Sequence, residues 1–391
     1  MNQSVYDVLI VGAGPAGNTL ACKLASDGLS VVLIDKQKLP RRKICAGGVS
    51  RKASIHIGYD ISSVIEKTIT GAYLTYRDEV ITHKVIEGIG ATVDRSTFDY
   101  YMTKKAVEAG ALLLEETELV YFIEDRDGVT AQTSGGDLRA KIIVGSDGAY
   151  SKVRKIMCPG AMPLFGHAIE ALVYPQPEML ETFGNNAMFD FGGIPGGYGW
   201  ILPKKDHFNI GLFKIKNSPR NSDMRRHLND FILRNRVLRN YKSIDIKGYP
   251  IPIKAVSRNL TGKRTLLIGD AAGLCDSFYG EGIYYAVWSA NCAHRAITGY
   301  LINDETLLRY NQYVRPIIYN QIFSRLTARL FYSAPRFGYY HMARNKWINN
   351  YYAQLIYGKV SFMHCFFKTI LFFPLWIFAP GDKPIDDSCL K

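Results

Sequence analysis

Apolar runs alternate with a helix-period stretch at the start of this chain. Residues 8–11 and 31–34 are each four consecutive aliphatic residues, which is typical of buried strands. Residues 19–27 lie between them and carry Leu20 and Leu24 at helical spacing, beside small residues. The order strand, helix, strand predicts the beginning of a parallel sheet of the Rossmann type.

The pattern changes twice along the rest of the chain. Beyond residue 70 it predicts short strands, a helix over 95–110, and then mostly strands as far as residue 213. Residues 265–268 are apolar in the style of the first strands, and 281–301 predict a long helix before a helical remainder. We therefore expect an α/β fold with an α+β insertion: a Rossmann-type domain, a β-rich lobe and a C-terminal helical region.

The nucleotide-binding domain is expected to be discontinuous in the sequence. Its three parts are predicted at 1–69, 95–160 and 256–302. Strands within 70–94 and a β-rich lobe at 161–255 are predicted to bind the substrate, and 303–391 form the helical region. Ligand sites favour such interfaces between lobes.

Composition narrows the class of protein. The chain has 391 residues, of which 47% are hydrophobic and 21% charged, which is enough for a large core. Its seven cysteines form no C-x-x-C pair, and the first predicted strand follows Met1 within a few residues. These features predict a cytoplasmic protein with reduced thiols and no signal peptide. The histidines show no metal-ligand spacing.

The net charge of +13 is unevenly placed. Residues 311–379 contain eight Lys or Arg, no Asp or Glu, and many aromatic residues. This combination predicts peripheral association with an anionic membrane surface, whereas no motif supports nucleic-acid binding. Residues 360–379 are apolar for about the length of a membrane span, but Lys368 and Pro374 interrupt them, so interfacial helices are favoured. A lid packed on the catalytic lobes is the alternative.

The turn after the first strand carries the glycine fingerprint of a dinucleotide site. Gly12 allows the sharp turn, Gly14 lets the backbone approach a pyrophosphate, and Gly17 lets helix and strand pack closely. The helix N-terminus that follows favours the pyrophosphate charge. Asp35 ends the second strand, where it would accept hydrogen bonds from ribose hydroxyls. The fingerprint alone does not separate FAD from NAD(P).

Three further motifs lie beyond the glycine fingerprint. The second of them has two parts, and the one described last lies between the other two in the chain. A strand leads into Gly145-Ser146-Asp147-Gly148, and a later strand leads into Gly269-Asp270-Ala271-Ala272-Gly273. Gly280-Glu281-Gly282-Ile283 then opens the long predicted helix, whose N-terminal dipole would stabilise a negative charge. The fourth motif is Tyr198-Gly199-Trp200-Ile201-Leu202-Pro203 with Gly211 after it.

With these motifs the chain resembles the FAD-dependent geranylgeranyl reductase family, within the p-hydroxybenzoate-hydroxylase-like flavoproteins. The match covers most of residues 6–301, although Leu202 and Phe213 replace a phenylalanine and a glycine of the family pattern. The resemblance implies FAD as cofactor and a polyprenyl-chain substrate held by Tyr198, Trp200, Pro203 and Gly211. The FAD-binding residues it implies are Gly12, Gly14, Pro15, Ala16, Gly17, Asp35, Lys36, Arg95, Asp147, Gly269, Asp270, Gly280, Gly282 and Ile283.

Cys45 is the candidate for handling the proton. It stands in Pro40-Arg41-Arg42-Lys43-Ile44-Cys45-Ala46-Gly47-Gly48, which resembles a cysteine-and-glycine segment of the family, and basic neighbours favour a thiolate. A small buried residue beside a glycine turn is the structural alternative.

The chemistry expected is hydride transfer from reduced flavin to an isoprenoid double bond of a lipid, a prenyl diphosphate or a chlorophyll-type precursor. The expected electron donor is NADPH, NADH or ferredoxin. The choice between them stays open, because no second nucleotide fingerprint is present. A flavin monooxygenase or halogenase on the same fold is one alternative. A non-catalytic prenyl-binding or escort protein is another.

Overall fold

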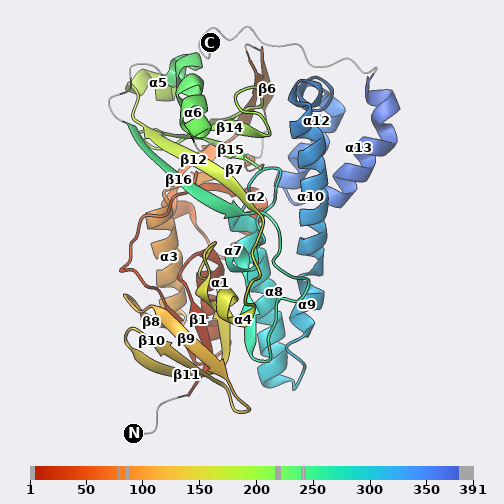
Figure 1. Ribbon diagram of the computed structural model, residues 1–391. Helices are drawn as coiled ribbons and strands as arrows, with labels where there is room; N and C mark the ends of the chain where they lie inside the picture. Colours follow the sequence, from red (N-terminus) through yellow and green to blue (C-terminus); the bar gives the residue numbers. More distant parts are fainter. Residues whose placement is uncertain are drawn as a thin grey trace.

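The computed structural model describes residues 5–77, 79–84, 88–215, 222–238, 241 and 244–377. Two seven-stranded sheets and one three-stranded sheet form the body of the protein. Figure 1 shows the first sheet at the N-terminal end of the molecule, the second sheet at the opposite end, and the C-terminal helices along one side of both.

The first sheet contains the predicted nucleotide-binding strands. Its order is β8-β2-β1-β11-β10-β9, with β17 also paired to β11. The pairs of β1 with β2 and β11, of β2 with β8 and of β11 with β17 are parallel, whereas β9, β10 and the first half of β11 form an antiparallel ribbon. The bounds are β1 (Val5–Val11), β2 (Val31–Ile34), β8 (Leu112–Leu114), β9 (Leu119–Glu124), β10 (Val129–Thr133), β11 (Gly136–Gly145) and β17 (Thr265–Leu267).

Helices complete this domain. The long helix α8 packs against α1 and α2, and α3 packs against α1, which buries the apolar faces of all four. Strands β1 and β2 are buried along their apolar runs, as continuous aliphatic strands of parallel sheets are. The helices are α1 (Pro15–Ser26), α2 (Arg51–Ile57), α3 (Arg95–Glu108), α4 (Lys152–Met157), α7 (Gly269–Ala272) and α8 (Ile283–Ile302).

The second sheet forms the β-rich lobe. Its order is β16-β12-β15-β14-β13-β5-β6, and helices α5 (Pro177–Phe183) and α6 (Ser222–Arg234) and the turn η2 (Arg236–Leu238) belong to this lobe. The strands are β5 (Gly71–Tyr76), β6 (Glu79–Lys84), β12 (Phe165–Val173), β13 (Asn186–Asp190), β14 (Gly197–Pro203), β15 (Phe208–Lys214) and β16 (Ile244–Pro252).

A small sheet joins the two parts. It has the order β3-β7-β4 and consists of β3 (Gly48–Ser50), β7 (Gly90–Val93) and β4 (Ile65–Ile69), with the turn η1 (Ser62–Val64) before β4. The sequence predicted a strand at β7 but not its pairing with β3 and β4. Strand β16 was not predicted at all, because Gly248, Pro250 and Pro252 hide its pattern; it tolerates them as an edge strand.

The C-terminal region is helical as predicted. It comprises α9 (Arg309–Tyr313), α10 (Arg315–Ser333), α11 (Pro335–Gly338), η3 (Tyr339–Ala343), α12 (Lys346–Ile356) and α13 (Phe362–Ile377). Helix α10 packs against α13, and both lie beside the second sheet in Figure 1. Within the described ranges, no helix combines the length and the apolar character needed to cross a membrane. The end of the predicted apolar segment, beyond residue 377, lies outside the described residues.

Candidate functional site

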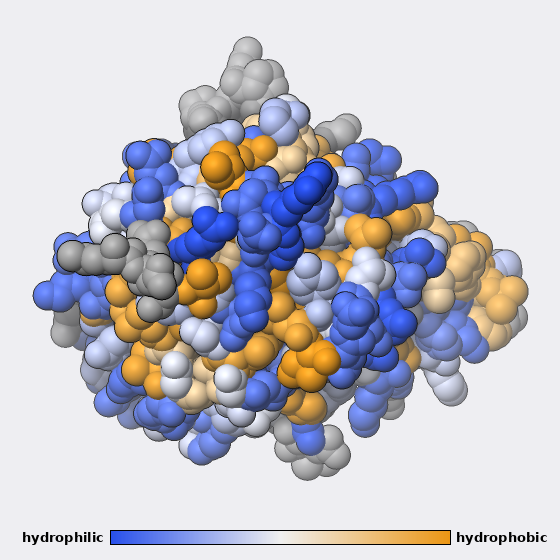
Figure 2. Space-filling view, turned by 90° about the horizontal axis from the view of Figure 1, so that it is seen from below, coloured by the Kyte–Doolittle hydropathy of each residue, from blue (hydrophilic) through white to orange (hydrophobic). Residues whose placement is uncertain are grey.

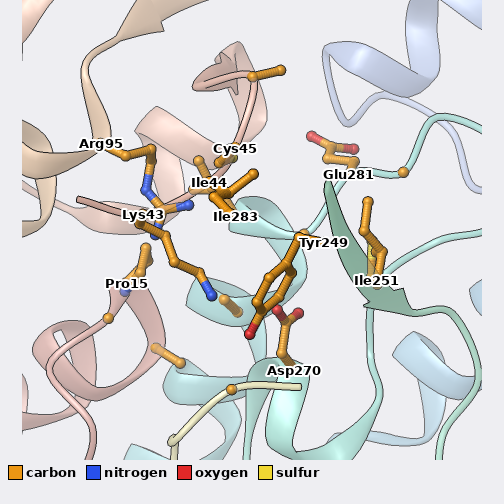
Figure 3. A pocket seen from close by; sticks show the side chains of 18 of the residues that line it. Pro15, Lys43, Ile44, Cys45, Arg95, Tyr249, Ile251, Asp270, Glu281 and Ile283 are labelled. Carbon is orange, nitrogen blue, oxygen red and sulfur yellow. The ribbon is translucent and has the colours of Figure 1, made fainter. Parts of the chain in front are cut away.

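Loops from one edge of the first sheet face a common cavity. Gly12 lies just beyond β1, Asp35 beyond β2, Asp147 beyond β11 and Asp270 beyond β17. Because these strands are parallel, their carboxyl ends lie at the same edge, which is where open α/β sheets bind ligands. The cavity has a volume of about 800 Å³, and Figure 3 shows part of it.

The glycine turn leaves free space at one position and is tightly packed at two others. Gly12 has φ 105°, and a Cβ there would lie 2.7 Å from the Ser146 carbonyl oxygen. Gly14 lines the cavity, and a Cβ there would meet nothing within 4 Å. Gly17 is not among the cavity-lining residues; a Cβ there would lie 2.0 Å from the Gly12 oxygen, so it sets the approach of α1 to the turn.

Asp35 is buried at the end of β2 and lines the cavity. Its Oδ2 accepts a hydrogen bond from the Ala13 backbone N–H at 3.0 Å and forms an ion pair with Arg41 Nη2 at 3.1 Å. The carboxylate therefore ties the second strand to the glycine turn. Pro15 and Ala16, at the start of α1, line the same cavity, and Lys36 lies at its exposed side.

Arg95 begins α3 and is buried, although its position in the sequence is equally compatible with an exposed helix start. Its guanidinium donates to both carboxylate oxygens of Asp99, at 2.8 and 2.9 Å. Burial lowers the pKa of Arg95, but the Asp99 charge outweighs it and the net pKa is raised. Arg95 thus places a fixed positive charge in the cavity wall.

The two aspartates of the later motifs lie in different environments. Asp147 caps α4 by accepting from the Lys152 backbone N–H at 2.6 Å. Asp270 lies near Lys43 in Figure 3, and burial raises its pKa whereas the Lys43 charge opposes this. Gly269, with φ 56°, does not line the cavity; it packs against Ala16 and α8.

The entry to α8 is held by charged groups. Gly280, Gly282 and Ile283 line the cavity, as does Glu281, whose Oε2 lies 2.7 Å from Lys52 Nζ. Asp276 is fully buried below this loop and accepts from the Glu281 backbone N–H at 2.7 Å. Burial, with help from the Glu281 charge, raises the pKa of Asp276 to about 6.

Cys45 lies in the cavity wall, near Ile283 in Figure 3. Its Sγ accepts from the Gly47 backbone N–H at 3.4 Å, and it interacts electrostatically with the buried cations Arg95 and Lys204. Lys204 also donates to the Val93 oxygen at 2.6 Å. The segment from Lys43 to Ala46 forms one side of the cavity, with Lys43 Nζ 4.1 Å from the Tyr249 ring centre.

An aromatic wall closes the opposite side. In the second sheet Ala168, Phe213 and Tyr198 form one cross-strand row, and Glu170, Gly211 and Trp200 form the next. Side chains of directly opposed residues lie on the same face, so both rows face the cavity. Pro203 and Gly211 do not line it themselves. Gly211 leaves room for Trp200, because a Cβ there would lie 2.3 Å from the indole ring.

Several polar residues in and behind the cavity wall were not identified from the sequence. Glu170 on β12 and Glu281 line the cavity, whereas Asn209 beside Trp200, Asp276 and Lys52 lie behind its wall. Glu170 and Asn209 had a usable signal, since each is a polar residue between two apolar neighbours in a strand. Among the described residues, no group of three or more His, Cys, Asp or Glu side chains could hold a metal ion.

The cavity fits FAD. Gly14 opens onto empty space, Asp35 ends the second strand, and α1 presents its N-terminus, an arrangement that suits the pyrophosphate and ribose of a dinucleotide. Comparison with protein families agrees: a model described as an FAD binding domain matches residues 5–53 and 88–173.

A relative settles the family. The chain is 30% identical over 298 residues to digeranylgeranylglycerophospholipid reductase 2 of Methanosphaera stadtmanae, covering 72% of this chain and 75% of the relative. The chain belongs to the geranylgeranyl reductase family. It is an FAD-dependent oxidoreductase.

Solved structures confirm the fold of this family member. A geranylgeranyl bacteriochlorophyll reductase-like protein from Thermoplasma acidophilum matches with a TM-score of 0.76 and 22% identity, covering 85% of this chain and 88% of that one. The flavin-dependent brominase Bmp2 matches with a TM-score of 0.72 and 19% identity, over 95% of this chain and all of the brominase. At these identities the likeness concerns the fold alone.

Proposed function

We propose that this reductase saturates double bonds of geranylgeranyl chains carried by a lipid, a prenyl diphosphate or a chlorophyll-type precursor. The observation that carries this substrate class is an apolar slot that adjoins the cofactor cavity. A second cavity of about 80 Å³ shares Ile89, Phe189, Tyr198, Tyr279 and Ile356 with the first. Its other lining residues are almost all apolar or aromatic: Ala72, Leu74, Phe191, Phe278, Phe331, Tyr332, Ala343, Asn349, Tyr352 and Ala353.

The slot runs between the second sheet and the helices α10 and α12, which supply Phe331, Tyr332, Tyr352 and Ile356. Its polar groups are largely satisfied within the protein: the Tyr198 hydroxyl donates to the Tyr279 oxygen, and the Tyr332 hydroxyl to the Phe278 oxygen at 2.7 Å. The Asn349 amide nitrogen, which has no hydrogen-bond partner among the described residues, is an exception in this wall. A wall that is otherwise apolar, with most of its hydroxyl groups already bonded within the protein, suits a hydrocarbon chain better than a polar substrate.

The residues of the chain divide the work of the reaction. When bound, reduced FAD supplies the hydride. We propose that the glycine turn, Asp35 and Arg95 hold the cofactor, and that Asp147, Asp270 and the entry to α8 hold its flavin end. Tyr198 and Trp200 would orient the alkene and exclude water. Cys45, beside two buried cations, would supply the proton to the neighbouring carbon.

The domain division supports this arrangement. We propose that the cofactor domain is assembled from 1–69, 95–160 and 256–302, and the substrate lobe from 70–94 and 161–255. The cavity lies between residues of both groups. We propose NADPH, NADH or ferredoxin as the electron donor; the single glycine fingerprint in the chain does not decide between them.

We propose a peripheral membrane surface on the C-terminal helices. At the right of Figure 2, in line with α13 in Figure 1, hydrophobic residues gather at the surface. The exposed apolar side chains of the C-terminal helices are Tyr319, Leu326, Leu330, Phe337, Trp347, Met363, Phe367, Ile370 and Leu371. Exposed apolar residues on a region with basic but no acidic side chains suit an anionic lipid surface.

Flotation with vesicles tests this surface. The protein should float with vesicles containing anionic phospholipid, and L371D should weaken flotation, because a charge would then face the bilayer. L233D is the matched control: Leu233 is 69% exposed, close to the 71% of Leu371, but lies on α6. Equal loss in both variants, or no flotation of the native protein, would rule this surface out.

Mass spectrometry of prenyl lipids after anaerobic incubation with dithionite-reduced enzyme tests the function itself. Mass gains in steps of two hydrogens are expected, with the headgroup unchanged. Incorporation of oxygen or halide in air, without anaerobic saturation, would instead identify a monooxygenase or halogenase. A purified protein that lacks flavin absorbance and cannot take up FAD would indicate an escort protein.

A further inference from the structure

Glu170 joins the two sides of the catalytic cavity. It lies on β12, is 5% exposed, and lines the cavity from the second sheet. One of its oxygens accepts a hydrogen bond from the Asn209 side chain at 3.3 Å. Cys45 lines the same cavity, and a hydrogen bond from its backbone N–H lowers the pKa of the Glu170 carboxyl group. A single buried carboxylate therefore contacts both the cysteine loop and the aromatic wall.

Asn209 extends this contact to Trp200. Its side-chain oxygen accepts from the Trp200 indole N–H at 2.9 Å while its amide nitrogen donates to Glu170. Asn209 is 2% exposed, so neither bond competes with much solvent. The opposite polarity of the two ends of an amide makes Asn suited to bridging a donor and an acceptor.

The sheet register makes this bridge possible. Glu170, Gly211 and Trp200 are directly opposed across β12, β15 and β14, and Asn209 lies two residues from Gly211 on the same face. Because Gly211 has no side chain, the indole can lie across β15 toward β12. A larger residue in the middle strand would separate the carboxylate from the ring.

Glu170 is a buried carboxylic acid, which distinguishes it from an apolar residue that only fills space. Burial raises the pKa of its carboxyl group above the ordinary value. The hydrogen bonds from Asn209 and Cys45 and the nearby charges of Arg42 and Lys204 lower the pKa, but they do not outweigh the effect of burial. A buried carboxylate is costly unless its hydrogen bonds are made. Its partners here are the Cys45 loop and Asn209, which in turn holds Trp200.

We propose that Glu170 is a positioning residue that fixes the Cys45 loop and, through Asn209, the plane of the Trp200 ring. The purpose of this role rests on the proposed function, because Glu170 would place the proton donor and the aromatic wall on either side of one alkene. It does not require contact between Glu170 and the substrate.

Two variants separate the two contacts of Glu170, which we call the Cys45 arm and the Trp200 arm. E170A removes both, whereas N209L removes only the arm to Trp200. E170Q keeps the carbonyl acceptor and serves as the conservative variant. E178A is the matched control, because Glu178 is exposed on α5 of the same lobe. All variants are compared as purified protein after thermal unfolding has established that each is folded.

The first readout is the rate of Cys45 alkylation by iodoacetamide, followed by peptide mass spectrometry with Cys158 as the internal reference. E170A should raise the Cys45 rate by about tenfold through loss of a charged hydrogen bond. N209L and E178A should leave it unchanged. The second readout is Trp200 emission, obtained by subtracting the spectrum of the W200F protein. It should shift in E170A and N209L, and E170Q should restore most of the native behaviour.

Equal alkylation rates in E170A, E170Q and the native protein would overturn the proposed role, as would an unchanged Trp200 emission in N209L. If E170A does not fold, N209L still decides the Trp200 arm, and E170L, which fills the same space without a hydrogen-bond acceptor, decides the Cys45 arm. Neither readout needs turnover, so an enzyme without prenyl-reducing activity would contradict the proposed function while leaving this test intact. In an active enzyme, N209L should raise KM for the prenyl substrate more than it lowers kcat.

Discussion

Lys52 Nζ lies 2.7 Å from Glu281 Oε2 at the entry to α8, and both side chains are largely buried. The Ser50 hydroxyl donates to the other Glu281 oxygen, and Asp276 holds the Glu281 backbone N–H. The Lys52 charge also lowers the pKa of Asp276, so one buried cation acts on two carboxylates beside the cofactor cavity. This relationship joins α2 to α8, and so the small sheet to the nucleotide domain.

Replacing Lys52 with Met should destabilise the protein by about 3 kcal/mol, because Glu281 would be left buried without its cation. Urea unfolding followed by circular dichroism measures the loss. The exposed pair of Lys105 and Glu108, also 2.7 Å apart, supplies the control K105M, which should leave the unfolding midpoint unchanged. Similar losses in both variants would mean that burial does not set the strength of the Lys52 pair.

The raised pKa of Asp276 predicts a pH dependence with a definite sign. Its value is about 6 in the folded protein against an ordinary value of 3.8, so the folded state binds the proton more tightly than the unfolded state. The native protein should therefore lose stability relative to D276N as the pH rises from about 4 to about 6, by on the order of 2 kcal/mol. Above that range the difference should be constant.

Urea midpoints of both proteins across this pH range provide the measurement. Other titrating groups are common to both proteins and cancel in the difference. D276N also loses acceptor capacity toward the Tyr279 and Glu281 backbone N–H groups, which adds a cost that does not vary with pH. A difference that stays flat, or that grows in the opposite direction, would contradict the assignment.

Introducing a methyl group at Gly211 should disturb the aromatic wall. The added Cβ would lie 2.3 Å from both the Trp200 ring and the Ile169 oxygen, so G211A should lose about 1–3 kcal/mol and shift the tryptophan emission. G248A is the matched control on β16, where a Cβ would approach nothing closer than 3.4 Å. A G211A protein as stable as G248A would show that the ring does not depend on this space.

Removing the Cys45 thiol should slow saturation without releasing the cofactor. C45A should lower kcat by roughly 100-fold, which is typical when a proton donor is lost, while the flavin content of the purified protein stays at the native level. C158A is the control thiol variant. Native double-bond reduction by C45A would remove Cys45 from the mechanism and favour the alternative of a small buried residue beside a glycine turn.

The nucleotide-binding part could be predicted because its signals are local. The aliphatic strands, the glycine turn and Asp35 lie within 30 residues and meet as expected at the sheet edge. The aromatic row was also visible, since Tyr198 and Trp200 alternate along one strand. These patterns follow from the periods of strand and helix, which a sequence displays directly.

The charged partners could not be predicted because they are distant in the sequence. Lys52 meets Glu281 across more than 200 residues, and Glu170 reaches the Cys45 loop only through the pairing of β12 with β15 and β16. Pro203 and Gly211 were expected in the cavity from their motif, but the strand alternation and the Trp200 ring place them behind it. Register between strands, and not residue type, decides these contacts.

The most direct test of the central mechanism is anaerobic stopped-flow absorbance of the dithionite-reduced enzyme mixed with a geranylgeranyl lipid. The flavin band near 450 nm should return only when the unsaturated lipid is added, with one double bond saturated for each flavin reoxidised. A flavin that stays reduced with the lipid, and is reoxidised only by oxygen, would contradict hydride transfer to the prenyl chain.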